Sequence, residues 1–141
     1  MLRTFLDTNV FLYAAGADHP FRDPCRRVLQ RVAEGTLDAV TSSEVVQELL
    51  HVLVRRGRRA DALRLARDVV ALFPDLLPVG REEMEVAADL LERLPQASVR
   101  DAVHAATMRT NGVAAIVTVD AHFDAFPGVR RVDPADAAPD R

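Results

Sequence analysis

The chain has 141 residues, of which 49% are hydrophobic, and its formal net charge at pH 7 is −3. This length and composition suit one compact domain with its own hydrophobic core, rather than a peptide or a multidomain array. The mildly acidic balance excludes a globally basic surface, so any contact with nucleic acid must come from a local patch. No stretch approaches the roughly 18 uninterrupted apolar residues of a membrane span, so we expect a soluble protein without membrane contact.

Cys25 is the single cysteine, so the chain cannot form an internal disulfide and has no Cys-x-x-Cys spacing for a metal. Disulfides are typical of oxidising compartments, and their absence favours a reducing one. Asp7 and Asn9 interrupt the apolar N-terminal stretch that would otherwise resemble a signal peptide. We therefore expect the protein in the cytoplasm.

Strand and helix patterns alternate along the chain. Short apolar runs predict strands, and apolar residues spaced three or four apart, with serine before them or glycine after them, predict helices. In chain order the predicted elements are a strand at 2–6, a helix at 10–15, a turn at 20–24, a helix at 26–34, a strand at 38–41, helices at 42–56 and 59–73, a strand at 76–79, helices at 82–94 and 98–111, and strands at 114–119 and 129–132.

This alternation predicts an α/β fold. Parallel strands need long crossover connections, which the intervening helices supply, so we expect a three-layer α/β/α arrangement with a mostly parallel central sheet. We expect one domain over 1–141, in which the final segment, 133–141, is frayed.

Four carboxylates are placed to meet at one edge of that sheet. Asp7 and Asp120 each follow an apolar strand, so both stand at the carboxyl edge, where ligands bind in open α/β sheets. Asp101 lies in the first turn of the helix at 98–111. Glu48 is about six residues into its helix, roughly 9 Å along the axis at 1.5 Å per residue, and its side chain leans back toward the helix N-terminus.

Four carboxylates in one pocket need a counter-charge, because two unit charges about 4 Å apart repel by roughly 4 kcal/mol at an effective dielectric of 20. Mg²⁺ and Mn²⁺ prefer oxygen ligands and keep open positions for water and phosphate. Such a site activates water and stabilises a phosphodiester under attack. The pattern therefore predicts a Mg²⁺ or Mn²⁺ site for phosphodiester chemistry.

Each acid also has a simpler structural explanation. Asp101 with Ser98 imitates a capping box, Glu48 fits a solvated helix flank, and Asp120 fits the start of a turn. Asp7 is the hardest to explain in this way, because an apolar strand has little reason to end on a charge.

The histidines offer a competing metal motif. Glu48-x-x-His51 and Asp101-x-x-His104 have the spacing found in di-iron helical bundles. That fold needs four long helices, whereas this chain alternates strands and short helices, so we expect His51 and His104 to be structural. No role is readable for the two remaining histidines, His19 and His122.

One local basic cluster is present: Arg55, Arg56, Arg58 and Arg59, around Gly57. Arginines at a helix C-terminus complement the helix dipole, and glycine there is a common cap. The alternative interpretation is contact with RNA phosphates or with a partner protein.

Four motifs in order carry a resemblance over essentially the whole chain: LDTNVFLY, SSEVVQELLHVL, RDAVHAATM and IVTVDAHFDAF. Together they resemble the PIN-domain ribonucleases and, in size and layout, the VapC toxins of toxin-antitoxin pairs. The resemblance implies a PIN-like α/β/α fold, Mg²⁺ or Mn²⁺ bound by carboxylates, and cleavage of single-stranded RNA. It also implies a homodimer and a cognate antitoxin protein that covers the site.

The same motifs imply residue roles. The catalytic and metal-binding acids of the family match Asp7, Glu48, Asp101 and Asp120. Small polar positions that support the site match Thr8, Asn9 and Thr118. Asp124, one helical turn beyond Asp120, is a candidate accessory ligand.

Two other functions are considered. A haloacid-dehalogenase-type phosphotransferase would have a second aspartate two residues after Asp7, where this chain has Asn9, and a lysine near the phosphoryl group, whereas all 18 basic residues here are arginine. The missing lysine also excludes a standard P-loop. A non-catalytic PIN-like module that binds RNA or protein remains open, although the presence of all four acids argues against it.

Overall fold

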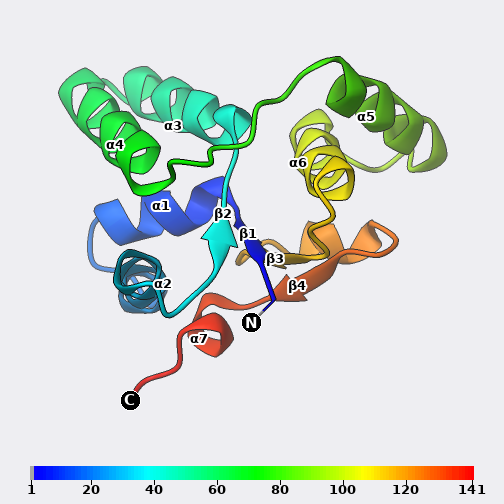
Figure 1. Cartoon of the computed structure of the whole chain (residues 1–141). Helices are drawn as coiled ribbons and strands as arrows, with labels where there is room; N and C mark the ends of the chain where they lie inside the picture. Colours follow the sequence, from blue (N-terminus) through cyan, green and yellow to red (C-terminus); the bar gives the residue numbers. More distant parts are fainter. Residues whose placement is uncertain (1) are drawn as a thin grey trace.

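A parallel sheet lies at the centre of the computed structural model, which describes residues 2–141 (Figure 1). Its strands follow the spatial order β2-β1-β3-β4, and neighbouring strands are all parallel. Phe5 of β1 pairs with Val40 of β2 on one side and with Ile116 of β3 on the other. The strands are β1 (Thr4–Leu6), β2 (Ala39–Val40), β3 (Ala115–Val117) and β4 (Arg130–Val132).

This strand order creates a switch point between β1 and β3. The chain moves from β1 to one side to form β2 and then crosses to the other side to form β3. In open α/β sheets the carboxyl ends of the strands at such a point line a crevice for ligands. Asp7 directly follows β1, and Asp120 follows β3 after a gap of two residues, so the topology positions both acids at this crevice.

Helices cover the sheet on both faces and give the three-layer arrangement expected from the sequence. Figure 1 shows the paired helices α3 and α4 on one side of the molecule and the paired helices α5 and α6 on the other. The helices are α1 (Thr8–Ala15), α2 (Arg22–Glu34), α3 (Ser43–Arg55), α4 (Arg59–Leu72), α5 (Arg81–Arg93), α6 (Val99–Thr110) and α7 (Pro134–Ala137), with a 3₁₀ helix, η1 (Ala121–Ala125), after β3. None of the helices within residues 2–141 has the length and apolar character needed to cross a membrane.

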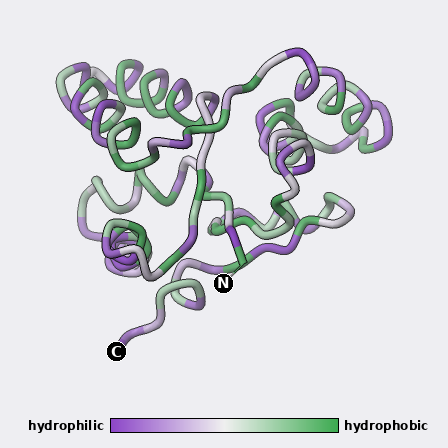
Figure 2. Tube along the Cα trace, viewed as in Figure 1, coloured by the Kyte–Doolittle hydropathy of each residue, from purple (hydrophilic) through white to green (hydrophobic). Residues whose placement is uncertain are grey.

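The core lies where the central strands meet the inner faces of the helices. Phe5, Leu6, Ile116 and Val117 are fully buried, as expected for parallel strands that are covered on both faces. Figure 2 shows hydrophobic and hydrophilic residues alternating along the helices, in keeping with one buried and one exposed face.

Two predicted elements differ from the structure. The predicted strand at 76–79 makes only an isolated parallel bridge, between Leu77 and Ser42, so the prediction of a full strand there is wrong. Helix α2 begins at Arg22 rather than at residue 26, with Pro24 in its first turn. Proline is tolerated there because the first backbone N–H groups of a helix have no partner within the helix.

The end of the chain is ordered against helix α2, so the expected fraying of 133–141 is wrong for most of that segment. Asp133 caps α7 by accepting a hydrogen bond from the backbone N–H of Ala135 at 2.9 Å. Ala138 is fully buried, and its carbonyl oxygen accepts a 3.0 Å hydrogen bond from Arg27 of α2. A buried alanine and an arginine contact far away in the sequence hold the tail in place.

Candidate active site

Asp7 is a buried carboxylate that accepts three hydrogen bonds. It is 6% exposed, and it caps helix α1 because its Oδ1 accepts a 2.7 Å hydrogen bond from the backbone N–H of Thr8. Its Oδ2 accepts hydrogen bonds from the Thr118 hydroxyl at 2.7 Å and from the Asn9 amide at 3.2 Å. The three predicted supporting residues therefore all contact this acid and fix its orientation.

Burial raises the pKa of Asp7, and the negative charge of Glu48 adds to this effect. His104 and the hydrogen bonds from Thr118 and Thr8 act in the opposite direction but do not cancel it. A buried carboxyl group with a raised pKa is typical of a functional site, where nearby charge stabilises the ionised form when a ligand is bound.

Thr118 connects Asp7 to Asp120. While its hydroxyl donates to Asp7, its oxygen accepts hydrogen bonds from the Asn9 amide and from the backbone N–H of Asp120, both at 3.0 Å. The ends of β1 and β3 are thereby joined through one hydroxyl group. Thr118 therefore links the two acids at the edge of the sheet where β1 and β3 pair.

Glu48 reaches the same site from helix α3. It is 7% exposed, its Oε2 accepts a 2.7 Å hydrogen bond from the Thr8 hydroxyl, and its Oε1 lies 2.9 Å from Nε2 of His104. Burial raises its pKa, but the contacts with His104 and Thr8 and the charge of Arg100 outweigh burial and lower it. The alternative of a solvated helix flank is therefore wrong.

His104 is the part of the site that the sequence did not reveal. Its ring is 1% exposed, and Nε2 lies 3.8 Å from Oδ1 of Asp7 as well as near Glu48. Burial lowers its pKa, but the charges of Glu48, Asp7 and Asp101 outweigh burial and raise it. The expected structural role is thus too narrow, because this imidazole contacts two of the acids and they favour its charged form.

Asp101 and Asp120 complete the cluster at its outer side. Burial raises the pKa of Asp101, and the charges of Asp120 and Asp7 raise it further. Both acids also belong to a helix start. Asp101 lies in the first turn of α6, where the Ser98 hydroxyl caps the helix by accepting from the backbone N–H of Asp101 at 3.2 Å, and Asp120 caps η1 by accepting from the backbone N–H of His122 at 2.8 Å. Helix capping and membership of the acidic cluster are therefore compatible.

His122 adds a nitrogen donor to this outer side. One ligand atom each from Asp101, Asp120 and His122 lies within 4.8 Å of the other two, and Nδ1 of His122 is 3.1 Å from Oδ1 of Asp120. A donor set of carboxylate oxygens and one imidazole nitrogen fits a divalent cation. The only sequence signal for His122 was its position two residues after a strand-end acid.

A cavity of about 580 Å³ opens beside these residues. Asp101 and His122 lie on its wall, and the rest of the lining is largely apolar. The α5–α6 connection and η1 with the residue after it supply these apolar residues: Leu94, Pro95, Ala97, Ala121, Ala125 and Phe126. The cluster is therefore accessible from a hollow large enough for part of a substrate.

Asp124 is engaged elsewhere. Its two carboxylate oxygens accept hydrogen bonds from Arg131, both at 3.1 Å, and these contacts hold its pKa below the ordinary value. The accessory-ligand role remains a prediction that no contact of this residue supports.

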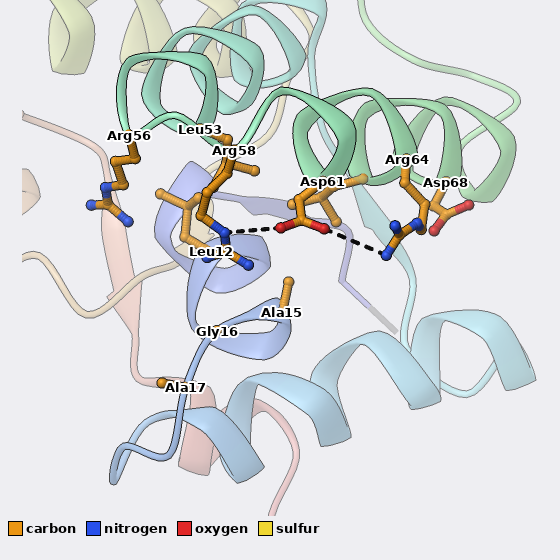
Figure 3. Close-up of a pocket in the computed structure, with 11 residues that line it drawn as sticks. Leu12, Ala15, Gly16, Ala17, Leu53, Arg56, Arg58, Asp61, Arg64 and Asp68 are labelled. Atoms are coloured by element: carbon orange, nitrogen blue, oxygen red, sulfur yellow. Dashed lines mark hydrogen bonds and ion pairs between the residues drawn. The ribbon is translucent and has the colours of Figure 1, made fainter.

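The arginine cluster divides into two pairs. Arg56 and Arg58 line a cavity of about 350 Å³ between α1 and the α3–α4 turn, whereas Arg55 and Arg59 do not line it (Figure 3). Asp61 accepts a 2.9 Å hydrogen bond from Arg58 and forms a 3.5 Å ion pair with Arg64. An adjoining hollow of about 340 Å³ shares Arg56 and extends to Asn9 of the acidic site.

Comparison with known proteins places this geometry in a family. A sequence model of the PIN domain matches residues 4–129. The chain belongs to the PIN-domain family. This membership accounts for the carboxylates at the switch point and excludes the haloacid-dehalogenase alternative.

Relatives of this PIN domain are named ribonucleases. Ribonuclease VapC13 of Mycobacterium tuberculosis is 34% identical over 128 residues, which is 90% of this chain and 97% of the relative. Ribonuclease VapC7 of the same organism is 38% identical over 137 residues, covering 94% and 92% of the two chains. Ribonuclease VapC23 is 40% identical over 116 residues, covering 82% and 91%.

Solved structures share the fold. The VapBC2 complex of Rickettsia felis, bound to a promoter DNA fragment, matches 94% of this PIN domain and 98% of its own chain with a TM-score of 0.74 and 18% identity. VapC20 of M. tuberculosis, described as a sarcin-ricin loop cleaving toxin, matches 90% and 98% with a TM-score of 0.72 and 23% identity. The α/β/α fold expected from the sequence is thereby confirmed.

Proposed function

We propose that this protein is a divalent-metal-dependent endoribonuclease that cleaves single-stranded RNA and acts as the toxin of a toxin-antitoxin pair. The observation that carries the proposal is the linked set of acids at the switch point between β1 and β3: Thr118 connects Asp7 to Asp120, and the charges of Asp120 and Asp7 both raise the pKa of Asp101. His104 lies buried beside Glu48 and Asp7, which favour its charged form, while burial keeps the pKa values of Asp7 and Asp101 raised.

The four acids would hold Mg²⁺ or Mn²⁺. Asp7 is oriented for this by Thr8, Asn9 and Thr118, and Asp101 and Asp120 present oxygens on the open side of the site. A bound ion would supply an activated water and neutralise charge on the phosphodiester. Glu48, whose oxygens contact Thr8 and His104, orients these two side chains in addition to contributing charge.

The partners belong to the same proposal. The fold is shared with the toxin chains of VapBC complexes, which supports a cognate antitoxin that covers the site. A homodimer and a cytoplasmic location are also proposed, in line with the expectations from the sequence. The hollow that runs from Asn9, which contacts Asp7, to Arg56 could hold a segment of the antitoxin beside the acids.

The test is cleavage of single-stranded RNA by the purified protein. We expect cleavage with Mg²⁺ or Mn²⁺, loss of cleavage in excess EDTA, and products that carry a 5′-phosphate and a 3′-hydroxyl, because water attacks phosphorus in line. Asp7→Asn should abolish cleavage. Asp124→Asn is the matched control, since it removes a carboxylate that is paired with Arg131 outside the cluster.

Three results would contradict the proposal: cleavage that persists in EDTA, products with 2′,3′-cyclic phosphate ends, or full activity of the Asp7→Asn protein. RNA binding without any cleavage would instead favour the non-catalytic PIN-like module.

A further inference from the structure

His122 is the most exposed side chain at the edge of the acidic cluster. Its side chain is 84% exposed, and it extends from the first turn of η1 directly after Asp120 and Ala121. Within residues 2–141, it joins Asp101 and Asp120 in the group whose ligand atoms are close enough to share one ion. His51 of α3 is also exposed but does not take part in such a group.

The contacts of His122 fix its backbone next to the acids. The backbone N–H of His122 donates to Oδ1 of Asp120 at 2.8 Å, and its Nδ1 lies 3.1 Å from the same oxygen. The short 3₁₀ turn therefore turns the imidazole back toward the acid that precedes it. Since the ligand atoms lie within 4.8 Å of one another, an ion with metal–ligand bonds of about 2.1 Å can contact all three after small adjustments.

We propose that His122 is a nitrogen ligand of the metal ion held by Asp101 and Asp120, and that it biases the site toward Mn²⁺ over Mg²⁺. The inference rests on the proposed function, because it concerns the same ion. Mg²⁺ is a hard ion that prefers oxygen, whereas imidazole suits transition metals and adds more to their affinity. One nitrogen in an oxygen site therefore changes which ion the site selects.

The first test detects the nitrogen directly. Metal-stripped protein is loaded with one equivalent of Mn²⁺, and electron spin-echo modulation from ¹⁴N is measured. We expect the modulation of a ligated imidazole in the wild type and in His51→Ala, and its loss in His122→Ala. The side chain of His122 is largely exposed, so its removal should leave the fold intact, and equal melting midpoints of the two variants in EDTA verify this.

The second test compares affinities by calorimetry with Mn²⁺ alone and Mg²⁺ alone. His122→Ala should weaken Mn²⁺ binding by roughly tenfold or more and Mg²⁺ binding by clearly less, so the Mn²⁺ preference falls. His122→Asn, which keeps a polar side chain, should behave in the same way. The control His51→Ala should keep the wild-type ratio.

The outcomes separate the two hypotheses. If Mn²⁺ binds to the wild type but the ¹⁴N modulation is absent, or is unchanged in His122→Ala, the inference about His122 is overturned while the proposed nuclease site stands. If both metal affinities fall equally in His122→Ala, the selectivity is overturned. If the wild type binds neither ion, the metal site in the proposed function fails and the inference fails with it.

Discussion

His104 and Glu48 form a buried pair in the middle of the acidic site: Nε2 of the imidazole lies 2.9 Å from Oε1 of the carboxylate. The two residues come from different helices, α6 and α3, and are 1% and 7% exposed. The contact therefore joins two helices that pair with different partners, and it places the imidazole where the charges of two other carboxylates, Asp7 and Asp101, favour its protonated form.

The first prediction concerns the pH dependence of this pair. The pKa of His104 is raised above its ordinary value of 6.5, so the stability from its charged form is present below that value and is lost as pH rises through the raised pKa. The pKa of Glu48 is lowered below its ordinary 4.5, so its contribution is present above that value and is lost as pH falls through the lowered pKa. The pair should stabilise the fold most between about 4.5 and 6.5.

The measurement is thermal unfolding of the wild type and His104→Gln in EDTA from pH 4 to 9. In the window named above, the substitution should cost about 3 kcal/mol, because it leaves a buried carboxylate without its partner. The difference should shrink at alkaline pH. His51→Gln on the exposed face of α3 is the control, and a His104→Gln deficit that does not change with pH would contradict the prediction.

The second prediction concerns Thr118 as a positioning residue. Its hydroxyl donates to Asp7 at 2.7 Å and lowers the pKa of that acid. Thr118→Val should raise the pKa of Asp7 and move the acidic limb of the pH–rate profile to higher pH, besides costing about 1 kcal/mol of stability.

The control for Thr118→Val is Thr107→Val. Thr107 is an equally buried threonine whose hydroxyl donates to the carbonyl of Val103 within α6 at 2.8 Å. The Thr107→Val protein should be less stable than the wild type but should keep the wild-type pH–rate profile. Matching profiles for the two variants would mean that Thr118 acts only in packing.

The third prediction divides the arginine cluster. Arg56 and Arg58 line the cavity beside α1, whereas Arg55 and Arg59 do not. In the inactive Asp7→Asn background, Arg56→Ala with Arg58→Ala should weaken binding of single-stranded RNA and reduce the salt dependence, by a slope of about 0.7 for each RNA phosphate that the protein no longer neutralises.

Fluorescence anisotropy at several salt concentrations measures both quantities. The double variant Arg55→Ala with Arg59→Ala removes the same charge and serves as the control. If the two double variants weaken RNA binding equally, only the net charge matters. If neither changes the affinity or its salt dependence, all four arginines have only the helix-capping role.

The sequence predicted what depends on local pattern. The apolar run before Asp7 and the one before Asp120 specify buried parallel strands, and their carboxyl ends have to meet at one edge of the sheet. The segment at 76–79 has a strand pattern too, but it makes a single bridge to Ser42. A segment forms a strand only when a neighbouring strand pairs with it along its length, and a local sequence pattern does not reveal whether such a neighbour exists.

The missed features depend on contacts between distant residues. His104 meets Glu48 across 56 positions of the chain, and Arg27 holds the carbonyl of Ala138 across 111. From the sequence alone, a histidine on the buried face of a helix is interpreted as a packing residue. Its contact with Glu48 becomes visible only when the position of helix α3 is known. The position of the His122 ring beside Asp120 depends on the 3₁₀ turn of η1, which the sequence pattern did not predict.

The last prediction uses the repulsion between the acids of the cluster. The charge of Asp120 raises the pKa of Asp101, which means that the two carboxylates destabilise each other when no cation lies between them. Asp120→Asn removes one charge and keeps an oxygen that can still cap the backbone N–H of His122. In EDTA this variant should therefore melt at a higher temperature than the wild type.

Mn²⁺ should reverse that order. A ligand at 100 times its dissociation constant stabilises the folded state by about 2.7 kcal/mol, so saturating Mn²⁺ should raise the wild-type melting midpoint by several degrees. The Asp120→Asn protein should gain less, because a neutral amide is a weaker ligand. Near pH 5 the gain of the wild type should shrink, since protons compete with the cation for Asp7 and Asp101, whose pKa values are raised. The control is Asp124→Asn, which lies outside the cluster and whose melting midpoint should rise with Mn²⁺ as much as that of the wild type.

The opposite result would be an Asp120→Asn protein that melts at a lower temperature than the wild type in EDTA and is stabilised by Mn²⁺ as much as the wild type. Asp120 would then be a helix cap alone, and other residues would have to hold the metal.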